Sequence, residues 1–256
     1  MKEITYTILA LLGIYLLIVA LLFIFQRKLL YFPVPIDPAF SADEITIDNN
    51  GIALHGWVLH PGKSRALIYF GGNSEPIANR RDYFDSLFVD YSVYLINYRG
   101  YGNSQGQPSE TALYADALAV YDHVRQQHDS ISVYGRSLGS GVAVYLAALR
   151  PVDKLILLTP YDSITAVAQS VYPMFPIRYL IKDHFDSASL ASEIDAPVLI
   201  TSAGLDRVIG LRHTLALRRE FTRAKVDYVQ IEGAAHNDVT EFPQYREAVA
   251  RFIAEN

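Results

Sequence analysis

The stretch ISVYGRSLGSGVAVYLAALR, residues 131–150, decides the fold of this chain. It begins with a short apolar run typical of a buried strand and continues with apolar residues at helical spacing. Between the two halves Ser137 stands in a Gly-x-Ser-x-Gly pattern, flanked by Gly135 and Gly139. A pattern this short also occurs in ordinary turns, so its meaning depends on the sequence around it.

Strand and helix signals alternate on both sides of this stretch, from about residue 43 to the end of the chain. We expect eight strands, at residues 44–47, 51–60, 66–72, 93–100, 131–137, 154–160, 197–204 and 226–233. Helices are expected at residues 76–88, 110–128, 138–150 and 211–222, with a last helix that ends at Phe252. The alternation is typical of α/β proteins and predicts a mostly parallel sheet with helices on both faces. In such sheets, ligands bind at the carboxyl ends of the strands.

The composition argues against several classes of function. The 256 residues are 51% apolar, carry a net charge of −5 and include no cysteine. We expect no nucleic-acid partner because the chain has no basic stripe, and no disulfide or cysteine-based zinc site is available to it. No His-Glu-x-x-His pattern or carboxylate-rich loop indicates a metal, and we expect no cofactor.

The first segment, ITYTILALLGIYLLIVALLFIF at residues 4–25, contains no charged residue. About 20 apolar residues suffice to cross a bilayer as a helix. A cleaved signal peptide is the alternative, but its apolar part usually has only about 7–15 residues. We therefore expect a single-pass transmembrane anchor. Lys2 lies at one end of it and Arg27 and Lys28 lie at the other, so the sequence leaves the membrane face open.

The composition divides the chain into an anchor, a linker and a folded domain. Residues 1–28 are the expected anchor, and residues 29–42 are a linker with three prolines. Residues 43–256 are the expected α/β domain. The sequence gives no indication of the oligomeric state.

A less regular stretch, residues 161–192, interrupts the alternation and is rich in aromatic side chains. We expect this stretch to form a short cap over the site. Tyr161, Tyr172 and Phe175 would then line an apolar pocket for the substrate. Packing of the same side chains against the sheet is the alternative.

Ser137 lies where a predicted strand meets a predicted helix, which is the context that a nucleophile elbow requires. A serine hydroxyl needs a base and an orienting acid, and in this kind of sheet the chain order is Ser, Asp or Glu, His. Asp206 and His236 each follow a later predicted strand. We predict that Ser137 is the nucleophile, that His236 accepts its proton and that Asp206 orients His236.

Asp162 is a rival for the role of the acid because it also follows a predicted strand. Asp238 is interpreted as structural, because DVTE has the form of a capping box for the last helix. The expected oxyanion donors are the backbone N–H groups of Leu138, at a helix start, and of Asn73, in the glycine-rich loop after the third strand. A role for that loop in packing alone is the alternative.

Six ordered motifs span essentially the whole chain: LLYFP, FGGNSE, NYRGYGNSQGQPSE, YGRSLGSGVA, AGLDRVI and HND. Together they resemble the membrane-anchored, bud-emergence-protein-like branch of the α/β-hydrolase superfamily, whose relatives include protein depalmitoylases and lysophospholipases. The resemblance implies an α/β-hydrolase fold. It also matches Ser137, Asp206 and His236 to the family's catalytic triad, and Leu138 and Asn73 to its oxyanion positions.

The sequence thus predicts a membrane-tethered serine hydrolase that cleaves an ester or thioester, on a small-molecule or lipid-like acyl substrate, through an acyl-enzyme. It would be a carboxylesterase, lipase or thioesterase. One alternative is a catalytically silent scaffold that binds a membrane partner, supported by Gly71 at a position where the family usually has histidine. A serine peptidase is the other. The acyl-chain length and the leaving group stay open.

Overall fold

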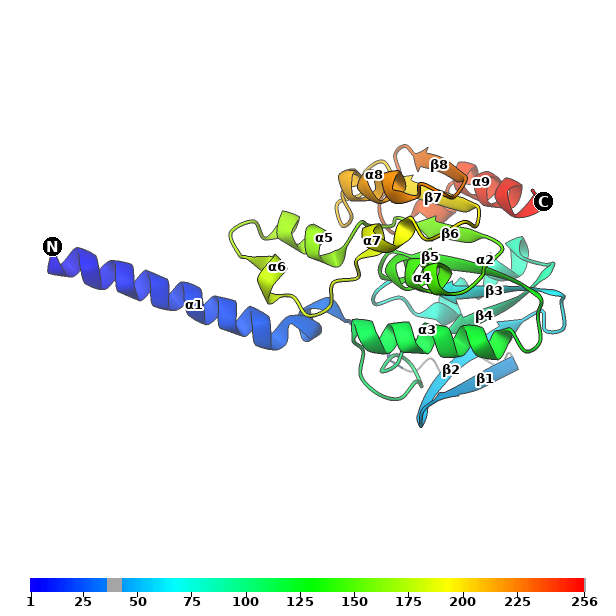
Figure 1. The fold of residues 1–256 in the computed structure, drawn as a ribbon, viewed down its shortest axis with the longest axis horizontal. Helices are drawn as coiled ribbons and strands as arrows, with labels where there is room; N and C mark the ends of the chain where they lie inside the picture. The colour runs from blue at the N-terminus through cyan, green and yellow to red at the C-terminus, as the bar shows by residue number, and fades with distance from the viewer. Residues whose placement is uncertain (36–42, 256) are drawn as a thin grey trace.

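The computed structural model describes residues 1–35 and 43–255. The second half of the predicted linker, residues 36–42, lies outside the described residues. The first element is the helix α1, Lys2–Leu30, which extends away from the rest of the protein (Figure 1). Of the helices in the described residues, it is the one long and apolar enough to cross a membrane. Directly after it, Tyr31 is buried in the core of the α/β domain, with 3% of its surface exposed.

The α/β domain is built on one eight-stranded sheet with the strand order β1-β2-β4-β3-β5-β6-β7-β8. The strands are β1 Asp43–Asn49, β2 Ile52–Leu59, β3 Arg65–Phe70, β4 Tyr91–Ile96, β5 Ser130–Arg136, β6 Leu155–Leu158, β7 Val198–Ala203 and β8 Val226–Ile231. β2 pairs antiparallel with β1 and β4, and the other neighbours pair in parallel. The mostly parallel eight-stranded sheet predicted from the sequence is therefore confirmed.

Helices cover both faces of the sheet. One face carries α3 Glu110–Val124, α4 Leu138–Leu149, α7 Ser187–Ala191 and α8 Leu211–Glu220, and the other carries α2 Arg81–Leu87 and α9 Pro243–Ala254. Two short 3₁₀ helices, Ile77–Arg80 and Val239–Glu241, precede α2 and α9. Because both faces are covered, the central strands are apolar on both sides, which explains their uninterrupted apolar runs in the sequence.

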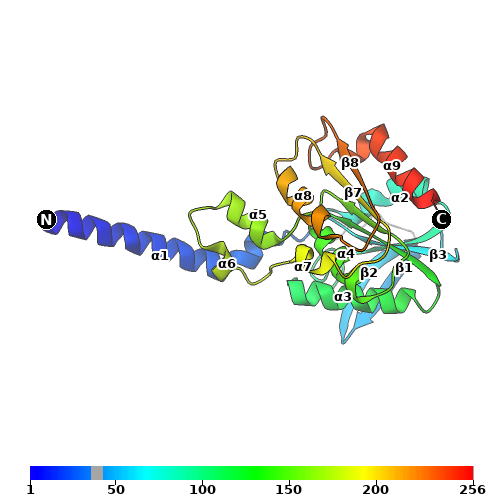
Figure 2. The ribbon, with the colours of Figure 1, turned by 45° about the horizontal axis from the view of Figure 1, so that its top comes forward.

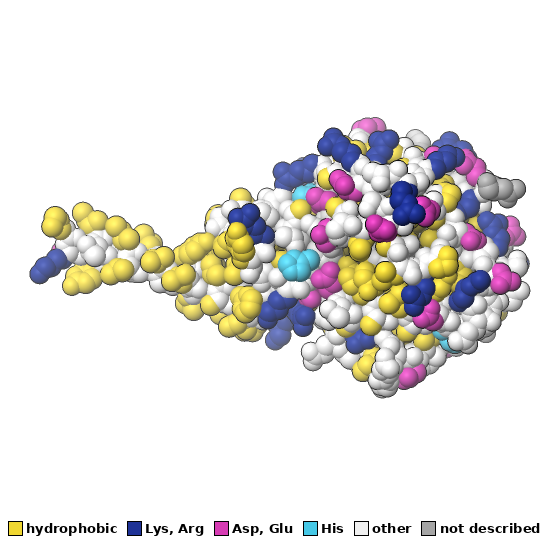
Figure 3. All heavy atoms as spheres, viewed as in Figure 1, with side chains coloured by type: hydrophobic (Ala, Val, Ile, Leu, Met, Phe, Trp, Pro, Cys, Tyr) yellow, Lys and Arg dark blue, Asp and Glu magenta, His cyan; other side chains and the backbone are white. Residues whose placement is uncertain are grey.

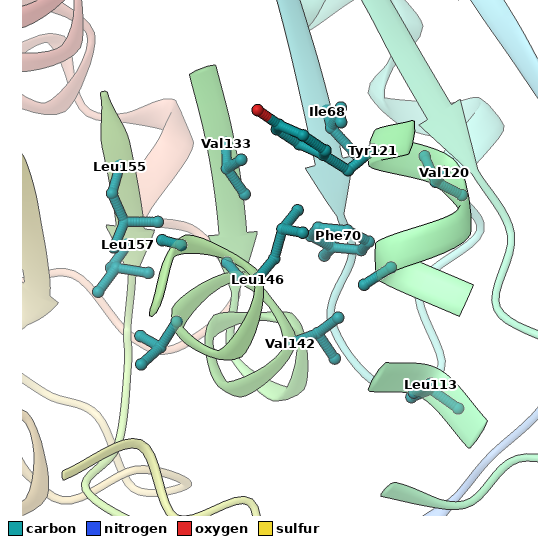
Figure 4. Packing of buried hydrophobic residues seen from close by; sticks show 14 of the residues in the cluster. Ile68, Phe70, Leu113, Val120, Tyr121, Val133, Val142, Leu146, Leu155 and Leu157 are labelled. Atoms are coloured by element: carbon teal, nitrogen blue, oxygen red, sulfur yellow. The ribbon is translucent and has the colours of Figure 1, made fainter. Parts of the chain in front are cut away.

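The packing of α4 on the sheet fixes the position of the turn that leads into it. Val142 and Leu146 of α4 lie against Val133 of β5 and Phe70 of β3 (Figure 4). Full burial of a side chain such as Leu146 stabilises the fold by roughly 1.5–3 kcal/mol. The packing of α4 against β5 and β3 therefore positions the turn between β5 and α4.

Two sequence predictions need correction. The helix expected at residues 76–88 is divided into the 3₁₀ helix Ile77–Arg80 and α2. Asp238 does not cap the last helix, which begins at Pro243 with Phe242 as its N-cap. Proline suits the first helical position because its missing N–H would have no partner there. The Asp238 carboxylate instead accepts the N–H of Ala235 at 2.7 Å and holds the loop around His236.

The irregular stretch contains α5, Ile164–Val171, and α6, Ile177–Leu180. Figures 1 and 2 show both helices beside the half of α1 that is nearer the domain. We use the name cap segment for residues 163–182. This segment extends away from the sheet and lies along α1.

Candidate active site

The turn between β5 and α4 has an unusual backbone conformation. Ser137 has φ 49° and ψ −118°, a positive φ that residues other than glycine rarely adopt. Its N–H donates to the carbonyl of Leu158 at 2.9 Å, which ties the turn to the neighbouring strand. A Cβ at Gly139 would lie 2.1 Å from the oxygen of Phe70, and one at Gly135 would lie 2.5 Å from the oxygen of Gly139. The glycines are therefore required by close backbone contact.

The side chains of Ser137, His236 and Asp206 form one hydrogen-bonded line. His236 Nε2 lies 2.9 Å from Ser137 Oγ, and His236 Nδ1 lies 2.7 Å from Asp206 Oδ2. A carboxylate can only accept, so Nδ1 carries the ring proton and Nε2 is left to accept from the serine hydroxyl. The three residues follow β5, β8 and β7, so three strand ends bring them together.

The Asp206 carboxylate is fixed on its other side by the backbone. Its Oδ1 accepts the N–H groups of Val208 and Ile209, each at 2.8 Å. The rival acid Asp162 lies elsewhere, where it hydrogen-bonds to His213 Nδ1 at 2.8 Å. The structure therefore places Asp206, and not Asp162, beside His236.

The two expected oxyanion donors lie on neighbouring segments. Leu138 is the first residue of α4, where the N–H groups have no acceptor within the helix. The loop after β3 lies against the elbow, because a Cβ at Gly139 would also lie 2.6 Å from the oxygen of Gly71. Both segments thus approach Ser137, at the carboxyl ends of β3 and β5.

The side chain of Asn73 connects this loop to the end of α1, and the sequence did not predict this connection. Its Nδ2 donates to the carbonyl of Leu30, the last residue of α1. Its Oδ1 accepts the N–H of Phe32 at 3.0 Å and the hydroxyl of Tyr101 at 2.8 Å. The loop and the end of α1 therefore share one hydrogen-bonded side chain.

A buried ion pair also holds the loop, and sequence reasoning missed it. Glu75 accepts the N–H of Gly72 at 2.6 Å and pairs with Arg80 and with Arg136, the latter at 2.8 Å. Arg136 also donates to Asn237 Oδ1 at 2.8 Å. Arg136 directly precedes Ser137, and Asn237 directly follows His236. The contacts of Arg136 with Glu75 and Asn237 therefore join three segments: the loop after β3, the elbow at Ser137 and the loop that carries His236.

The charge of Glu75 is stabilised by its partners. Burial acts to raise the pKa of the Glu75 carboxyl, but the charges of Arg136 and Arg80 outweigh it, so the pKa lies below its ordinary value. A Cβ at Gly71 would lie 3.1 Å from Glu75 Oε2 and 3.3 Å from Ile77. The buried carboxylate of Glu75 is thus packed against Gly71, which leaves little room for a larger side chain there.

The three residues expected to line a pocket are not gathered around Ser137. Tyr161 is fully buried and donates to the carbonyl of Leu138 at 3.1 Å, whereas Tyr172 is 52% exposed. Phe175 stacks on Tyr15 of α1, with ring centroids 5.6 Å apart. Tyr161 therefore contacts the start of α4, whereas Tyr172 and Phe175 belong to the cap segment.

A cavity of about 560 Å³ lies at the amino ends of the strands, on the side of the sheet away from Ser137. It is lined by residues at the amino ends of strands, among them Arg65, Ser130 and Lys154. Ligands of such sheets bind at the carboxyl ends, so this cavity lies away from the position expected for a substrate of Ser137. In the described part of the chain, no cluster of three His, Asp or Glu side chains is placed to hold a metal ion.

Known proteins resemble this chain in both sequence and structure. A family model described as serine aminopeptidase, S33, matches residues 67–182. An uncharacterized protein of Mycobacterium tuberculosis is 34% identical over 90% of this chain and 88% of its own length. The α/β hydrolase domain-containing protein 17B of Xenopus laevis is 32% identical over 76% of this chain and 68% of its own length.

Solved esterases share the fold. Est1E from Butyrivibrio proteoclasticus, solved with ferulic acid, has a TM-score of 0.67 at 19% identity and covers 82% of this chain and 97% of that one. An esterase from Pyrococcus furiosus has a TM-score of 0.68 at 16% identity, over 87% of this chain and 98% of that one. The fold and the elbow define the class as an α/β hydrolase. Within that class, the chain belongs to the branch that contains α/β hydrolase domain-containing protein 17B, which confirms the family predicted from the sequence motifs.

Proposed function

We propose that this chain is a membrane-anchored serine hydrolase that cleaves carboxylic ester or thioester bonds through an acyl-enzyme. The observation that carries the proposal is the line from Asp206 through His236 to Ser137, with hydrogen bonds of 2.7 and 2.9 Å. Such a line activates a serine hydroxyl that is otherwise too weak a nucleophile.

In the proposed reaction, Ser137 Oγ attacks the acyl carbon while His236 Nε2 accepts the hydroxyl proton. The oxyanion that forms receives hydrogen bonds from the N–H groups of Leu138 and Asn73. His236 then gives the proton to the leaving alcohol or thiol, and the acyl group stays on Ser137. Water then attacks the acyl carbon while His236 accepts its proton. The acid leaves as the bond to Ser137 Oγ breaks, and His236 returns the proton to Ser137 Oγ. Asp206 stabilises the imidazolium in both steps.

Anchoring of the enzyme by α1 is part of the proposal. Its apolar residues 4–25 are long enough to cross a bilayer, and the helix has no buried residue. An acyl substrate that resides in or near the membrane suits an active site attached to such a helix. The proposal leaves the membrane face unassigned.

A serine peptidase is the second candidate, because the matching family model describes an aminopeptidase. An aminopeptidase needs an unpaired carboxylate near the nucleophile to bind the substrate's ammonium group. Glu75 is the buried carboxylate beside the oxyanion loop, and Arg136 and Arg80 already neutralise it. The charge balance therefore favours an uncharged acyl substrate over a peptide amino terminus.

The test is labelling of the purified chain with a fluorophosphonate probe, together with hydrolysis of p-nitrophenyl esters and acyl thioesters. Ser137→Ala should abolish both and keep the melting temperature. Ser170→Ala is the matched control, because Ser170 Oγ also lies near a histidine, 3.3 Å from His213 Nε2, which pairs with Asp162. Labelling that persists in Ser137→Ala and disappears in Ser170→Ala would reassign the nucleophile. A wild-type chain without labelling would favour the silent scaffold.

A further inference from the structure

The cap segment is attached to α1 at two levels. At the outer level, the hydroxyl of Tyr15 donates to the carbonyl of Met174 at 3.0 Å. At the inner level, Gln26 Nε2 donates to the carbonyl of Leu180 at 3.0 Å, and Gln26 Oε1 accepts the N–H of Lys182 at 2.6 Å. The cap segment therefore lies beside residues 15–26 of α1 (Figure 2).

If α1 spans the membrane as proposed above, the spacing of these two levels along α1 predicts how deeply the cap segment lies in the bilayer. Tyr15 and Gln26 are about 16 Å apart along the helix axis, at 1.5 Å per residue. One leaflet contributes about half of the roughly 30 Å hydrocarbon core. With residues 4–25 in the core, Gln26 lies at its edge and Tyr15 lies near its middle. Met174 then lies near the bilayer midplane.

The surface of the cap segment suits such a position. Residues 163–181 contain one charged residue, Arg178, whose long side chain can reach toward the interface. Four of its large apolar side chains are more than half exposed: Val171, Tyr172, Met174 and Tyr179. Figure 3 shows hydrophobic side chains that cover α1 and continue onto the adjoining part of the protein, whereas charged groups are spread over the domain.

Basic side chains mark the inner level, where the hydrocarbon would end. Lys182 lies over the ring of Phe23, and Lys28 lies over the ring of Phe25. Arg27 forms two hydrogen bonds with the buried carboxylate of Asp183, at 2.9 and 3.1 Å. Lysine and arginine at this level are placed to meet lipid headgroups.

Several backbone groups of the turn between α5 and α6 have hydrogen-bond partners, which suits a lipid environment because unpaired backbone groups are costly in hydrocarbon. Pro173 and Pro176 have no N–H. Gln169 Nε2 donates to the carbonyl of Phe175 at 3.0 Å, and Tyr15 donates to that of Met174. The N–H of Phe175 donates to the carbonyl of Tyr172 at 3.1 Å.

We propose that the cap segment inserts into one leaflet of the bilayer beside α1, with the acyl chains of membrane lipids as its partner. The segment follows the carboxyl end of β6, and α1 ends beside Asn73 at the carboxyl end of β3. The edge of the sheet that carries Ser137 therefore faces the membrane. An acyl chain in that leaflet reaches the site without crossing water.

The test uses depth measurements, which do not depend on activity. The chain has no cysteine, so single variants Met174→Cys, Ile8→Cys and Val89→Cys each carry one site for an environment-sensitive nitrobenzoxadiazole label. All three native side chains are more than half exposed, and Val89 lies on the α/β domain. The full chain is reconstituted in phosphatidylcholine vesicles, and nitroxides at shallow or deep positions of the lipid chains quench the label.

We expect blue-shifted emission at positions 8 and 174, with position 174 quenched more by the deep nitroxide, and aqueous emission at position 89. A lipid-exposed label at 8 with an aqueous label at 174 would overturn the cap insertion and leave the anchor intact. Aqueous labels at both positions would overturn the anchor and the insertion together. Neither result bears on the serine mechanism, which the probe labelling tests.

A second measurement connects the insertion to substrate. Met174→Asp should lower hydrolysis of long-chain esters in vesicles by at least about tenfold, since an acidic residue is costly at the centre of a membrane. Hydrolysis of a soluble acetyl ester should stay unchanged, because Met174 lies outside the proposed catalytic machinery. Equal rates of the variant and wild type on vesicles would contradict the proposed route for the acyl chain.

Discussion

The two segments that supply the proposed oxyanion donors are held in different ways. The elbow at Ser137 and Leu138 is fixed by the strands on either side of it and by the glycines beneath it. The loop at Asn73 is fixed by remote residues: Arg136 acts through Glu75 on one side, and the end of α1 acts through the Asn73 side chain on the other. One half of the site is thus local to the sheet, and the other half depends on the end of α1.

The largest effect is expected on the elbow side. His236→Ala should lower kcat by roughly 10⁴–10⁶-fold, because Ser137 loses its base. The elbow itself rests on the sheet, so the melting temperature should change little. Steady-state kinetics with a soluble ester and a thermal melt measure the two quantities. A loss of only tenfold would show that His236 is not the base.

The next effect concerns the connection between the two segments. Arg136→Met should destabilise the fold by about 3–5 kcal/mol, because it leaves the Glu75 carboxylate buried with one fewer partner. The double variant Arg136→Met with Glu75→Gln is the matched control and should recover part of that loss. Denaturant unfolding measures both. If the double variant is as unstable as the single one, the pair does not act as a unit.

A smaller effect is expected from the loop side alone. Asn73→Ala keeps the backbone N–H but removes the hydrogen bonds to Leu30 and Phe32. We expect kcat to fall about tenfold with KM unchanged, less than the 10²–10³-fold typical for the loss of an oxyanion donor. Gln26→Ala is the control, because it loosens α1 from the cap segment without touching the loop. An equal loss in both variants would point to a general effect of α1.

The smallest effect is a dependence on pH. The lowered pKa of Glu75 means that its ionised form stabilises the fold fully above the ordinary carboxyl pKa of about 4.3. That contribution is lost as the pH falls through the lowered pKa of the folded state. Wild type should therefore lose more stability than Glu75→Gln between pH 5 and pH 3, as followed by melting temperature. Parallel curves for the two chains would contradict it.

The sequence predicted the parts of this molecule that depend on local pattern and chain order. The strand, turn and helix around Ser137 follow from periodicity and glycine spacing, and Asp206 and His236 follow from their positions after strands. The partners of Glu75 and Asn73 could not be predicted from the sequence. Glu75 and Arg136 are 61 positions apart, and a buried pair at that separation leaves no local pattern. The same holds for the cap segment, whose apolar residues suit a pocket wall and a membrane contact equally well.

The burial of Tyr31 affects how this protein can be divided into modules. The boundary between α1 and the α/β domain does not fall at the end of the apolar run. Tyr31 packs in the core of the domain, and the carbonyl of Leu30 accepts a hydrogen bond from Asn73. A fragment that begins between residues 33 and 43 would lose the core side chain of Tyr31 and the hydrogen bonds that Asn73 makes with Leu30 and Phe32. Exchange of α1 for an unrelated apolar helix would keep the proposed membrane attachment. It would disturb the loop at Asn73, unless the junction from Leu30 to Phe32 were kept.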